Sequence, residues 1–94
     1  MDIEFDEAKR LVTLRERGLD FTRARDVFSA EVFSQLDDRH PYGEPRYITA
    51  GYLDGDLIVM VWTPRGPARR IVSMRKCHAK ERRRYQIYRV GRSR

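Results

Sequence analysis

Two apolar runs joined by an Asp-Gly pair place the strongest constraint on how this chain folds. Residues 47–53 and 57–63 are rich in β-branched and aromatic side chains, and Asp54-Gly55-Asp56 separates them. An Asp-Gly pair between such runs is a strong indicator of a β-hairpin. The second run is apolar from Leu57 to Trp62, as expected of a central strand covered on both faces. We therefore predict an antiparallel pair at the centre of a sheet.

Further strands are expected on either side of this hairpin. Residues 69–75 follow a Pro-Arg-Gly-Pro turn at residues 64–67 and are predicted to form the next strand. A short edge strand is expected at residues 32–36, before a loop rich in Asp, Pro and Gly. Side chains alternate between the faces of a strand. This alternation would group Arg69, Ile71, Ser73 and Arg75 on one face and Arg70, Val72 and Met74 on the other.

Three helices are expected around these strands. Asp6 is placed to cap a helix that ends near Arg17, where Gly18 supplies the left-handed residue common at helix ends. Thr22 is placed to cap a short second helix, and residues 78–90 are predicted to form the last one. Apolar side chains available for packing are Ala8, Leu11, Val12 and Leu14 in the first helix, Ala24, Val27 and Phe28 in the second, and Tyr85, Ile87 and Tyr88 in the third.

This order of elements predicts one α+β domain spanning residues 1–94: two N-terminal helices, an antiparallel meander and a C-terminal helix. We expect the helices on one face of the sheet and the opposite face partly open. A chain of 94 residues supports one modest core and no deep cavity. The functional site should therefore be an open surface.

Charge is divided unevenly along the chain. Residues 1–56 hold 8 Lys or Arg against 13 Asp or Glu, whereas residues 57–94 hold 12 against 1, a net of +11. Of the 20 basic residues 17 are arginine, whose planar guanidinium binds phosphate with two hydrogen bonds. Lysine would serve solubility equally well, so this bias favours a nucleic-acid partner over a merely solvated surface.

Several classes of site and location are excluded or disfavoured. Cys77 is the only cysteine, so no internal disulfide and no thiolate zinc site is expected, and His40 and His78 cannot complete a metal site alone. We expect no cofactor and no metal. The N-terminal residues resemble no secretory signal, and no apolar stretch approaches membrane-spanning length. A cytoplasmic protein without a membrane partner is expected.

An ordered set of short motifs resembles the BrnT toxins, which belong to the RelE-like ribonucleases. The resemblance covers residues 3–88. The motifs are F-D-x-x-K at Phe5, Asp6 and Lys9; then Leu14, Gly18, Phe21, Ala24, Val27 and Phe28; Asp38 and Arg39; Glu44, Arg46 and Gly51; Val61, Thr63 and Arg65; Ile71, Val72, Ser73 and Arg75; and finally Glu81 and Tyr85.

The resemblance implies a RelE-like fold and a ribonuclease that halts translation as the toxin of a type II toxin–antitoxin system. It also implies neutralisation by a BrnA-type antitoxin whose ribbon-helix-helix domain binds the promoter, so that promoter DNA is bound only through the complex. By analogy with the RelE-like arrangement, Arg75 and Arg46 would stabilise the charge that develops at the scissile phosphate. The basic residues expected to bind RNA beside them are Arg65, Arg69, Arg70, Lys76 and Lys80.

The last helix carries candidates for acid–base catalysis. His78, Glu81 and Tyr85 are spaced three and four residues apart, so one helix face can present all of them. Glu81 would serve as a base, orient an arginine, or form an ordinary helix ion pair. His78 is suited to proton transfer, and Tyr85 would stack on a base, position an oxygen or pack in the core.

RNA carries its own nucleophile, the 2′-hydroxyl, so metal-independent cleavage needs only a base, cations and an acid. Three alternatives remain at this stage: a non-catalytic nucleic-acid-binding module, a relative that poisons gyrase, and a subunit that binds an acidic protein. The first would need the same arginines but not Glu81. The third explains the charge but not the preference for arginine.

Overall fold

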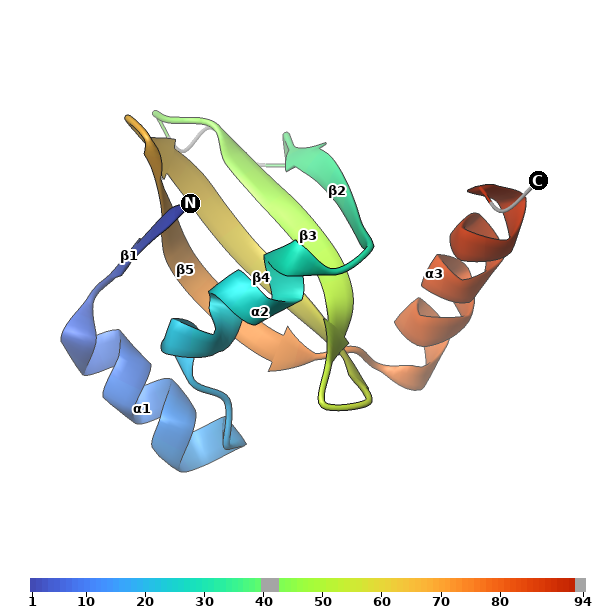
Figure 1. Cartoon of the computed structure of the whole chain (residues 1–94), viewed down its shortest axis with the longest axis horizontal. Coiled ribbons are helices and arrows are strands. Elements are labelled where there is room, and N and C mark those ends of the chain that lie inside the picture. The colour runs from blue at the N-terminus through green and yellow to red at the C-terminus, as the bar shows by residue number, and fades with distance from the viewer. Residues whose placement is uncertain (40–42, 93–94) are drawn as a thin grey trace.

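A five-stranded sheet forms the centre of the computed structural model, which describes residues 1–39 and 43–92, with side chains as far as Tyr85 (Figure 1). The strand order is β1-β5-β4-β3-β2. In chain order the elements are β1 (Asp2–Phe5), α1 (Glu7–Arg17), the 3-10 turn η1 (Phe21–Arg23), α2 (Ala24–Ser29), β2 (Val32–Asp37), β3 (Arg46–Leu53), β4 (Asp56–Arg65), β5 (Ala68–Lys76) and α3 (Ala79–Arg92).

The predicted hairpin is confirmed. Strands β3 and β4 pair antiparallel through a turn in which Asp54 and Gly55 both have positive φ, at 51° and 85°. That conformation is the one an Asp-Gly turn provides, since glycine has no Cβ to clash. The expected edge strand is also present as β2, and it pairs antiparallel with β3.

The sheet is mixed, and the expectation of a purely antiparallel meander was wrong. Strand β1 pairs parallel with β5, with Asp2 opposite Ala68 and Phe5 opposite Ile71. Its inward side chains, Ile3 and Phe5, pack on the main core. Burial of these two apolar side chains stabilises the pairing of β1 with the sheet. A parallel pairing needs a long connection, and here the helices and three further strands provide it.

A bulge in β5 overturns the predicted alternation of its side chains. Val61 of β4 lies opposite Ser73 and Trp62 lies opposite Ile71, which leaves Val72 as the extra residue. Ile71 and Met74 therefore both face the main core, three residues apart. Ser73 and Arg75 lie on the opposite face, so Arg75 does not share a face with Ile71 as the alternation predicted.

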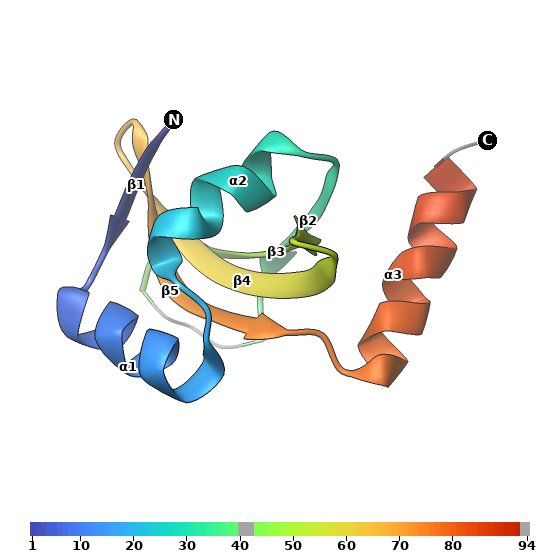
Figure 2. The same ribbon diagram turned by 60° about the horizontal axis from the view of Figure 1, so that its bottom comes forward.

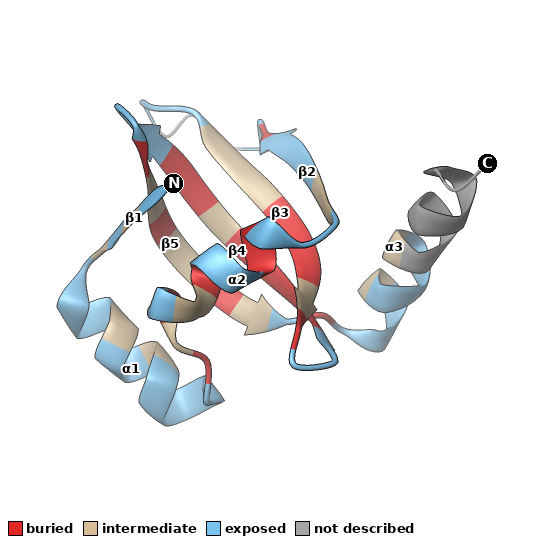
Figure 3. Ribbon diagram, viewed as in Figure 1, coloured by how far each residue is buried: buried red, intermediate tan, exposed pale blue. Residues whose placement is uncertain are grey.

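The main core lies between the sheet and α2. Phe21, Ala24 and Val27 pack there against Met60 and Ile71, each at most 2% exposed, and red marks their burial in Figure 3. Inside this layer the Trp62 Nε1–H donates to the hydroxyl of Thr49 at 2.7 Å. Gly51 has no room for a side chain, because an added Cβ would lie 2.9 Å from methyl groups of Val27 and Val32.

The N-terminal helices depart in part from expectation. Asp6 caps α1 and Gly18 ends it with φ 69°, as predicted, but none of the α1 residues is buried, and Leu11, Val12 and Leu14 are between 38% and 51% exposed. Thr22 is not the cap of the next helix, since the carboxylate of Asp20 instead accepts its backbone N–H. α1 lies beside β5, next to the edge strand β1, and its apolar side chains have little apolar surface to pack against.

The helices do not all cover one face, contrary to the prediction. Figure 2 shows α2 above the sheet, with α1 and α3 beyond its two sides. On the face opposite α2, Tyr85 of α3 packs on a small second core of Ala50, Leu57, Val59 and Cys77. The predicted packing residues Ile87 and Tyr88 lie outside the described side chains.

Candidate nucleic-acid interface

The sheet face opposite α2 carries four arginines on three strands, and we call it the basic face. Register places Arg75 beside Val59 and Arg70 beside Thr63, and alternation adds Arg46 and Arg65 to the same side. From Arg75 to Arg65 this face spans roughly 20 Å along the strands, at ~3.3 Å per residue. The face opposite α2 therefore carries Arg75 together with Arg46, Arg65 and Arg70, and not with Arg69 as the alternation predicted.

Arg75 is clamped by Glu81 at the α3 end of the basic face. The Arg75 Nη1 and Nη2 groups donate to the two carboxylate oxygens of Glu81 at 2.7 and 2.8 Å. Both side chains are partly exposed, at 36% and 25%. A two-point pair of this kind fixes the plane of the guanidinium, which a single contact does not.

Glu81 also begins α3. Its Oε1 accepts the backbone N–H of His78 at 3.0 Å, and His78 O accepts the N–H of Arg82, so His78 is the N-cap and Glu81 is the third helical residue. The Arg75 guanidinium, helped by the His78 N–H, lowers the pKa of Glu81 from 4.5 to about 2. A carboxylate held so firmly in its charged form is a poor proton acceptor, so Glu81 fits the role of an orienting group.

Burial raises the pKa values of two titratable groups near the clamp, Tyr85 of α3 and Cys77 just before it. Tyr85 packs edge-on against Phe33, with ring centroids 5.7 Å apart, and burial raises the pKa of its hydroxyl. Burial also raises the pKa of the Cys77 thiol to about 11, which leaves little reactive thiolate. The His78 side chain is exposed. Of the three candidates, Tyr85 has a clear packing role, Glu81 is partly exposed and His78, at the N-cap of α3, is exposed.

Arg46 lies far from Arg75 on the same face. Val59 of β4 is paired with Ala50 of β3 on one side and with Arg75 of β5 on the other. Arg46 comes four residues before Ala50 on β3. At ~3.4 Å per residue and ~4.8 Å per strand, the Cα atoms of the two arginines are about 17 Å apart. The structure therefore does not bring these two predicted catalytic arginines together.

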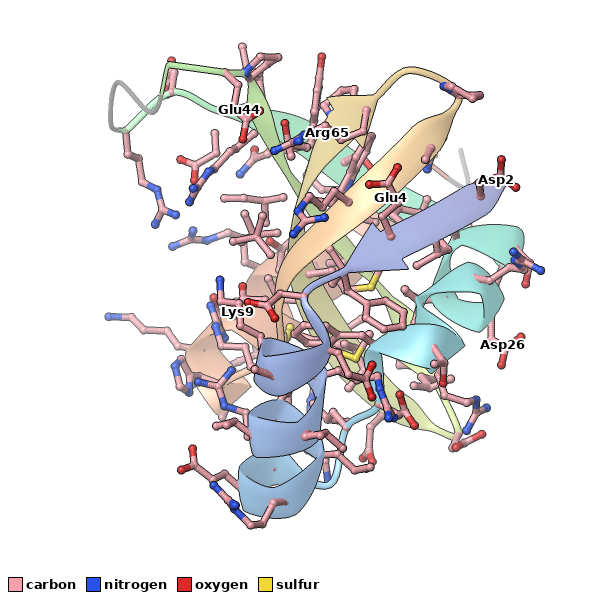
Figure 4. All side chains as sticks on the ribbon, turned by 90° about the vertical axis from the view of Figure 1, so that its left-hand side faces the viewer. Asp2, Glu4, Lys9, Asp26, Glu44 and Arg65 are labelled. Carbon is pink, nitrogen blue, oxygen red and sulfur yellow. The ribbon has the colours of Figure 1, made fainter. Side chains whose placement is uncertain are left out.

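Arg46 instead lines a groove between α1 and the sheet, which we call the α1 groove. Three cations that sequence reasoning did not select line it as well: Lys9, Arg17 and Arg39. Lys9 and Arg39 belong to the short motifs of residues 1–56, the part of the chain with a net negative charge, and no site role was assigned to them from the sequence. In Figure 4, Lys9 lies on the side of the sheet away from Asp26 of α2.

The other predicted RNA-binding residues are dispersed. On the basic face, Arg65 pairs with Glu44 at 3.4 Å and Arg70 with Glu4 at 3.6 Å. Arg69 lies on the opposite face, where its guanidinium stacks 4.5 Å and 4.6 Å from the ring centroids of Phe28 and Trp62. Lys76 is exposed beside Asp56 at the end of β5, and Lys80 is exposed on α3.

The described residues offer no clustered metal ligands and no membrane-spanning helix. No group of three or more His, Cys, Asp or Glu side chains gathers there in the manner of a metal site. Within the same part of the chain, every helix is too short or too polar to cross a membrane.

Comparison with known families agrees with the chemistry of the basic face. The model of a family described as the ribonuclease toxin BrnT of type II toxin–antitoxin systems matches residues 5–81. The chain belongs to the BrnT family. No curated protein matches it significantly. The BrnT match includes Arg75, Glu81 and every cation of the α1 groove, whereas Tyr85 lies beyond it.

Membership of the BrnT family makes RNA the substrate class and a protein antitoxin the partner. The alternatives of a gyrase poison and of a non-catalytic module are thereby disfavoured, since the family is one of ribonucleases.

Proposed function

We propose that this BrnT chain is an endoribonuclease that cleaves RNA without a metal ion, with Arg75 as the cation at the scissile phosphate. The observation that carries the proposal is the two-point pair between Arg75 and Glu81 on an open arginine face. Preorganised charge at the site of a developing anion is commonly the largest contribution to catalysis.

The reaction needs no group that the chain lacks. The 2′-oxygen of a ribose attacks the adjacent phosphorus as its proton passes to a base, and the bond from phosphorus to the 5′-oxygen then breaks as the protonated base gives a proton to that oxygen. The products are a 2′,3′-cyclic phosphate and a 5′-hydroxyl. Negative charge grows on the phosphoryl oxygens between these steps, and that charge is what a guanidinium stabilises.

Arg75 retains donors for this purpose. A guanidinium has five N–H groups, and Glu81 occupies one on each terminal nitrogen. The Nε–H has no hydrogen-bond partner in the described part of the chain, and with the second Nη2–H it forms a parallel pair of donors. This edge suits two oxygens of one phosphate, while the Glu81 clamp holds it in place.

Proton transfer falls to His78 in this proposal. Glu81 is held as a carboxylate by Arg75 and serves as a positioning residue, and Tyr85 anchors α3 on the second core. The exposed imidazole of His78 adjoins the clamp through its backbone, and an imidazole can both accept and donate a proton near neutral pH. Arg65, Arg70, Lys76 and Lys80 would bind flanking phosphates, and Arg46 is assigned to RNA binding.

The cellular setting completes the proposal. We place the chain in the cytoplasm with a RelE-like fold and a BrnA-like ribbon-helix-helix antitoxin, whose complex with the toxin binds promoter DNA. The strong positive charge of residues 57–94 supports an acidic protein surface as the neutralising partner.

The test compares Arg75→Ala with Arg83→Ala, a matched loss of charge at an exposed position on α3. Single-stranded RNA is incubated with each protein in EDTA, and the product ends are identified. We expect the unaltered chain and Arg83→Ala to give 2′,3′-cyclic phosphate ends, and Arg75→Ala to lose about 10²- to 10³-fold in kcat. Cleavage that stops in EDTA and returns with Mg²⁺, or equal activity of the two variants, would overturn the mechanism.

A further inference from the structure

The α1 groove is separate from the Arg75 clamp and is built from five parts of the chain. It lies between α1, the end of β2, the start of β3 and the middle of β4 and β5, and its volume is about 570 Å³. From its charge, shape and position we infer that this groove is a second phosphate-binding site, which holds the RNA backbone to one side of the scissile bond. The inference rests on the proposed binding of RNA to the basic face.

Charge in the groove is unbalanced. Four cations and one carboxylate line it, Lys9, Arg17, Arg39 and Arg46 against Asp37, which leaves a net charge of +3. Lys9 makes no ion pair with any residue in the described part of the chain. Like charges that share a groove repel one another and favour a bound anion. Such a surplus is expected where a polyanion binds.

Two of the cations are held in position by the fold. The Arg17 guanidinium donates to the carbonyl oxygen of Met74 at 2.9 Å, which ties the end of α1 to β5. The Arg39 guanidinium forms a two-point pair with Asp37, at 2.7 and 3.0 Å, and the Asp37 side chain is only 1% exposed. Because these long side chains are already ordered, less conformational entropy is lost when they bind a ligand.

The floor of the groove suits a nucleotide better than a bare anion. Val61 and Val72 supply apolar surface, and Val72 is the bulged residue of β5. Thr13 and Ser73 add hydroxyl groups, which donate hydrogen bonds to phosphate and sugar oxygens. A volume of about 570 Å³ falls in the range of small-ligand sites.

Position connects the groove to the reaction. Ser73 lies two residues before Arg75 on the same strand and face, so their Cα atoms are about 7 Å apart. An RNA strand with its scissile phosphate at Arg75 therefore passes into the groove within a nucleotide or two. Binding there would keep the strand in register with the clamp without taking part in bond breaking.

The test uses Lys9→Gln and Arg17→Gln in the full chain, with Arg25→Gln as the matched control. Arg25 is an exposed arginine on α2, which covers the other face of the sheet. Binding of a non-cleavable RNA, with 2′-deoxyribose at the cleavage position, is measured against salt concentration. Each phosphate contact to single-stranded RNA adds about 0.7 to the slope of log K against log salt. We expect each groove variant to lower the slope by about that amount, and Arg25→Gln to leave it unchanged.

Kinetics on cleavable RNA separates this inference from the proposed function. We expect the groove variants to raise KM several-fold with little change in kcat, whereas Arg75→Ala lowers kcat. If Arg75→Ala proves fully active, the catalytic proposal fails while the salt slopes still test the groove. An unchanged slope in Lys9→Gln and Arg17→Gln would overturn the inference. Unchanged RNA binding with weakened antitoxin binding would overturn it too and assign the groove to the protein partner.

Discussion

Replacing Glu81 with glutamine tests the clamp on Arg75 most directly. Glutamine has nearly the same shape, but it offers one carbonyl oxygen where the carboxylate offers two, and its amide N–H₂ faces a guanidinium that can only donate. The two-point pair with Arg75 and the cap on the His78 N–H cannot then both be kept. We expect a loss of stability and a fall in kcat, because the plane of the guanidinium is no longer fixed.

The size of the stability effect follows from the pKa of Glu81. A shift from 4.5 to about 2 corresponds to ~3.4 kcal/mol at ~1.36 kcal/mol per unit. Both partners are partly exposed, at 36% and 25%, so solvent screening reduces this to about 1 to 2 kcal/mol. A misplacement of the guanidinium on the order of 1 Å would lower kcat about 10²-fold.

Dependence on pH makes the prediction specific to the carboxylate. The folded protein holds the pKa of Glu81 below its value in the unfolded chain, so the stabilisation is complete above pH 4.5 and is lost as the pH falls toward 2. Urea unfolding of the unaltered protein and of Glu81→Gln should differ by about 1 to 2 kcal/mol at pH 7. More than half of that difference should be gone at about pH 3.

The control for this experiment is Arg83→Gln, an exposed position on the same helix. It should show no difference that depends on pH in this range. If the gap between the unaltered protein and Glu81→Gln is the same at pH 3 as at pH 7, the carboxylate does not carry the stabilisation. If kcat is also unchanged, Glu81 does not position Arg75.

Two further predictions concern packing and the antitoxin. Gly51→Ala should destabilise the domain by about 1 to 3 kcal/mol, since the added methyl meets Val27 and Val32 at 2.9 Å; a melting temperature within a degree of the unaltered protein would contradict this packing. Titration with the antitoxin should abolish RNA binding, because the +11 charge of residues 57–94 attracts an acidic partner to the basic face. RNA binding and cleavage that persist at full antitoxin occupancy would show that the partner binds elsewhere.

Local chemistry made part of this fold predictable from the sequence. The turn at Asp54-Gly55, the cap at Asp6 and the left-handed end at Gly18 each depend on residues within a few positions of one another. Each of these residue types has a conformational preference strong enough to act without the rest of the fold. The helix and strand assignments around them were correct for the same reason.

Features that depend on distant contacts were not predictable in this way. No residue type marks Val72 as the bulge of β5, so simple alternation placed Arg75 on the wrong face relative to Ile71. The spacing of apolar residues in α1 indicates a helix, but it does not show how much apolar surface of the sheet is available to cover them. Leu11 is 51% exposed. Arg17 reaches Met74 across 57 positions of sequence, which is why the α1 groove was missed.

Parallel pairing of β1 with β5 also sets the order in which the sheet can form during synthesis. Asp2 is made before its partner Ala68, with 66 positions of sequence separating the two. Closing so long a loop costs chain entropy that contacts with the sheet must offset, and β1 cannot pair until β5 has been made. Glu4 joins Arg70 on the basic face at that same step. A cell that makes this toxin therefore meets the complete basic face only after translation has passed the end of β5 at Lys76.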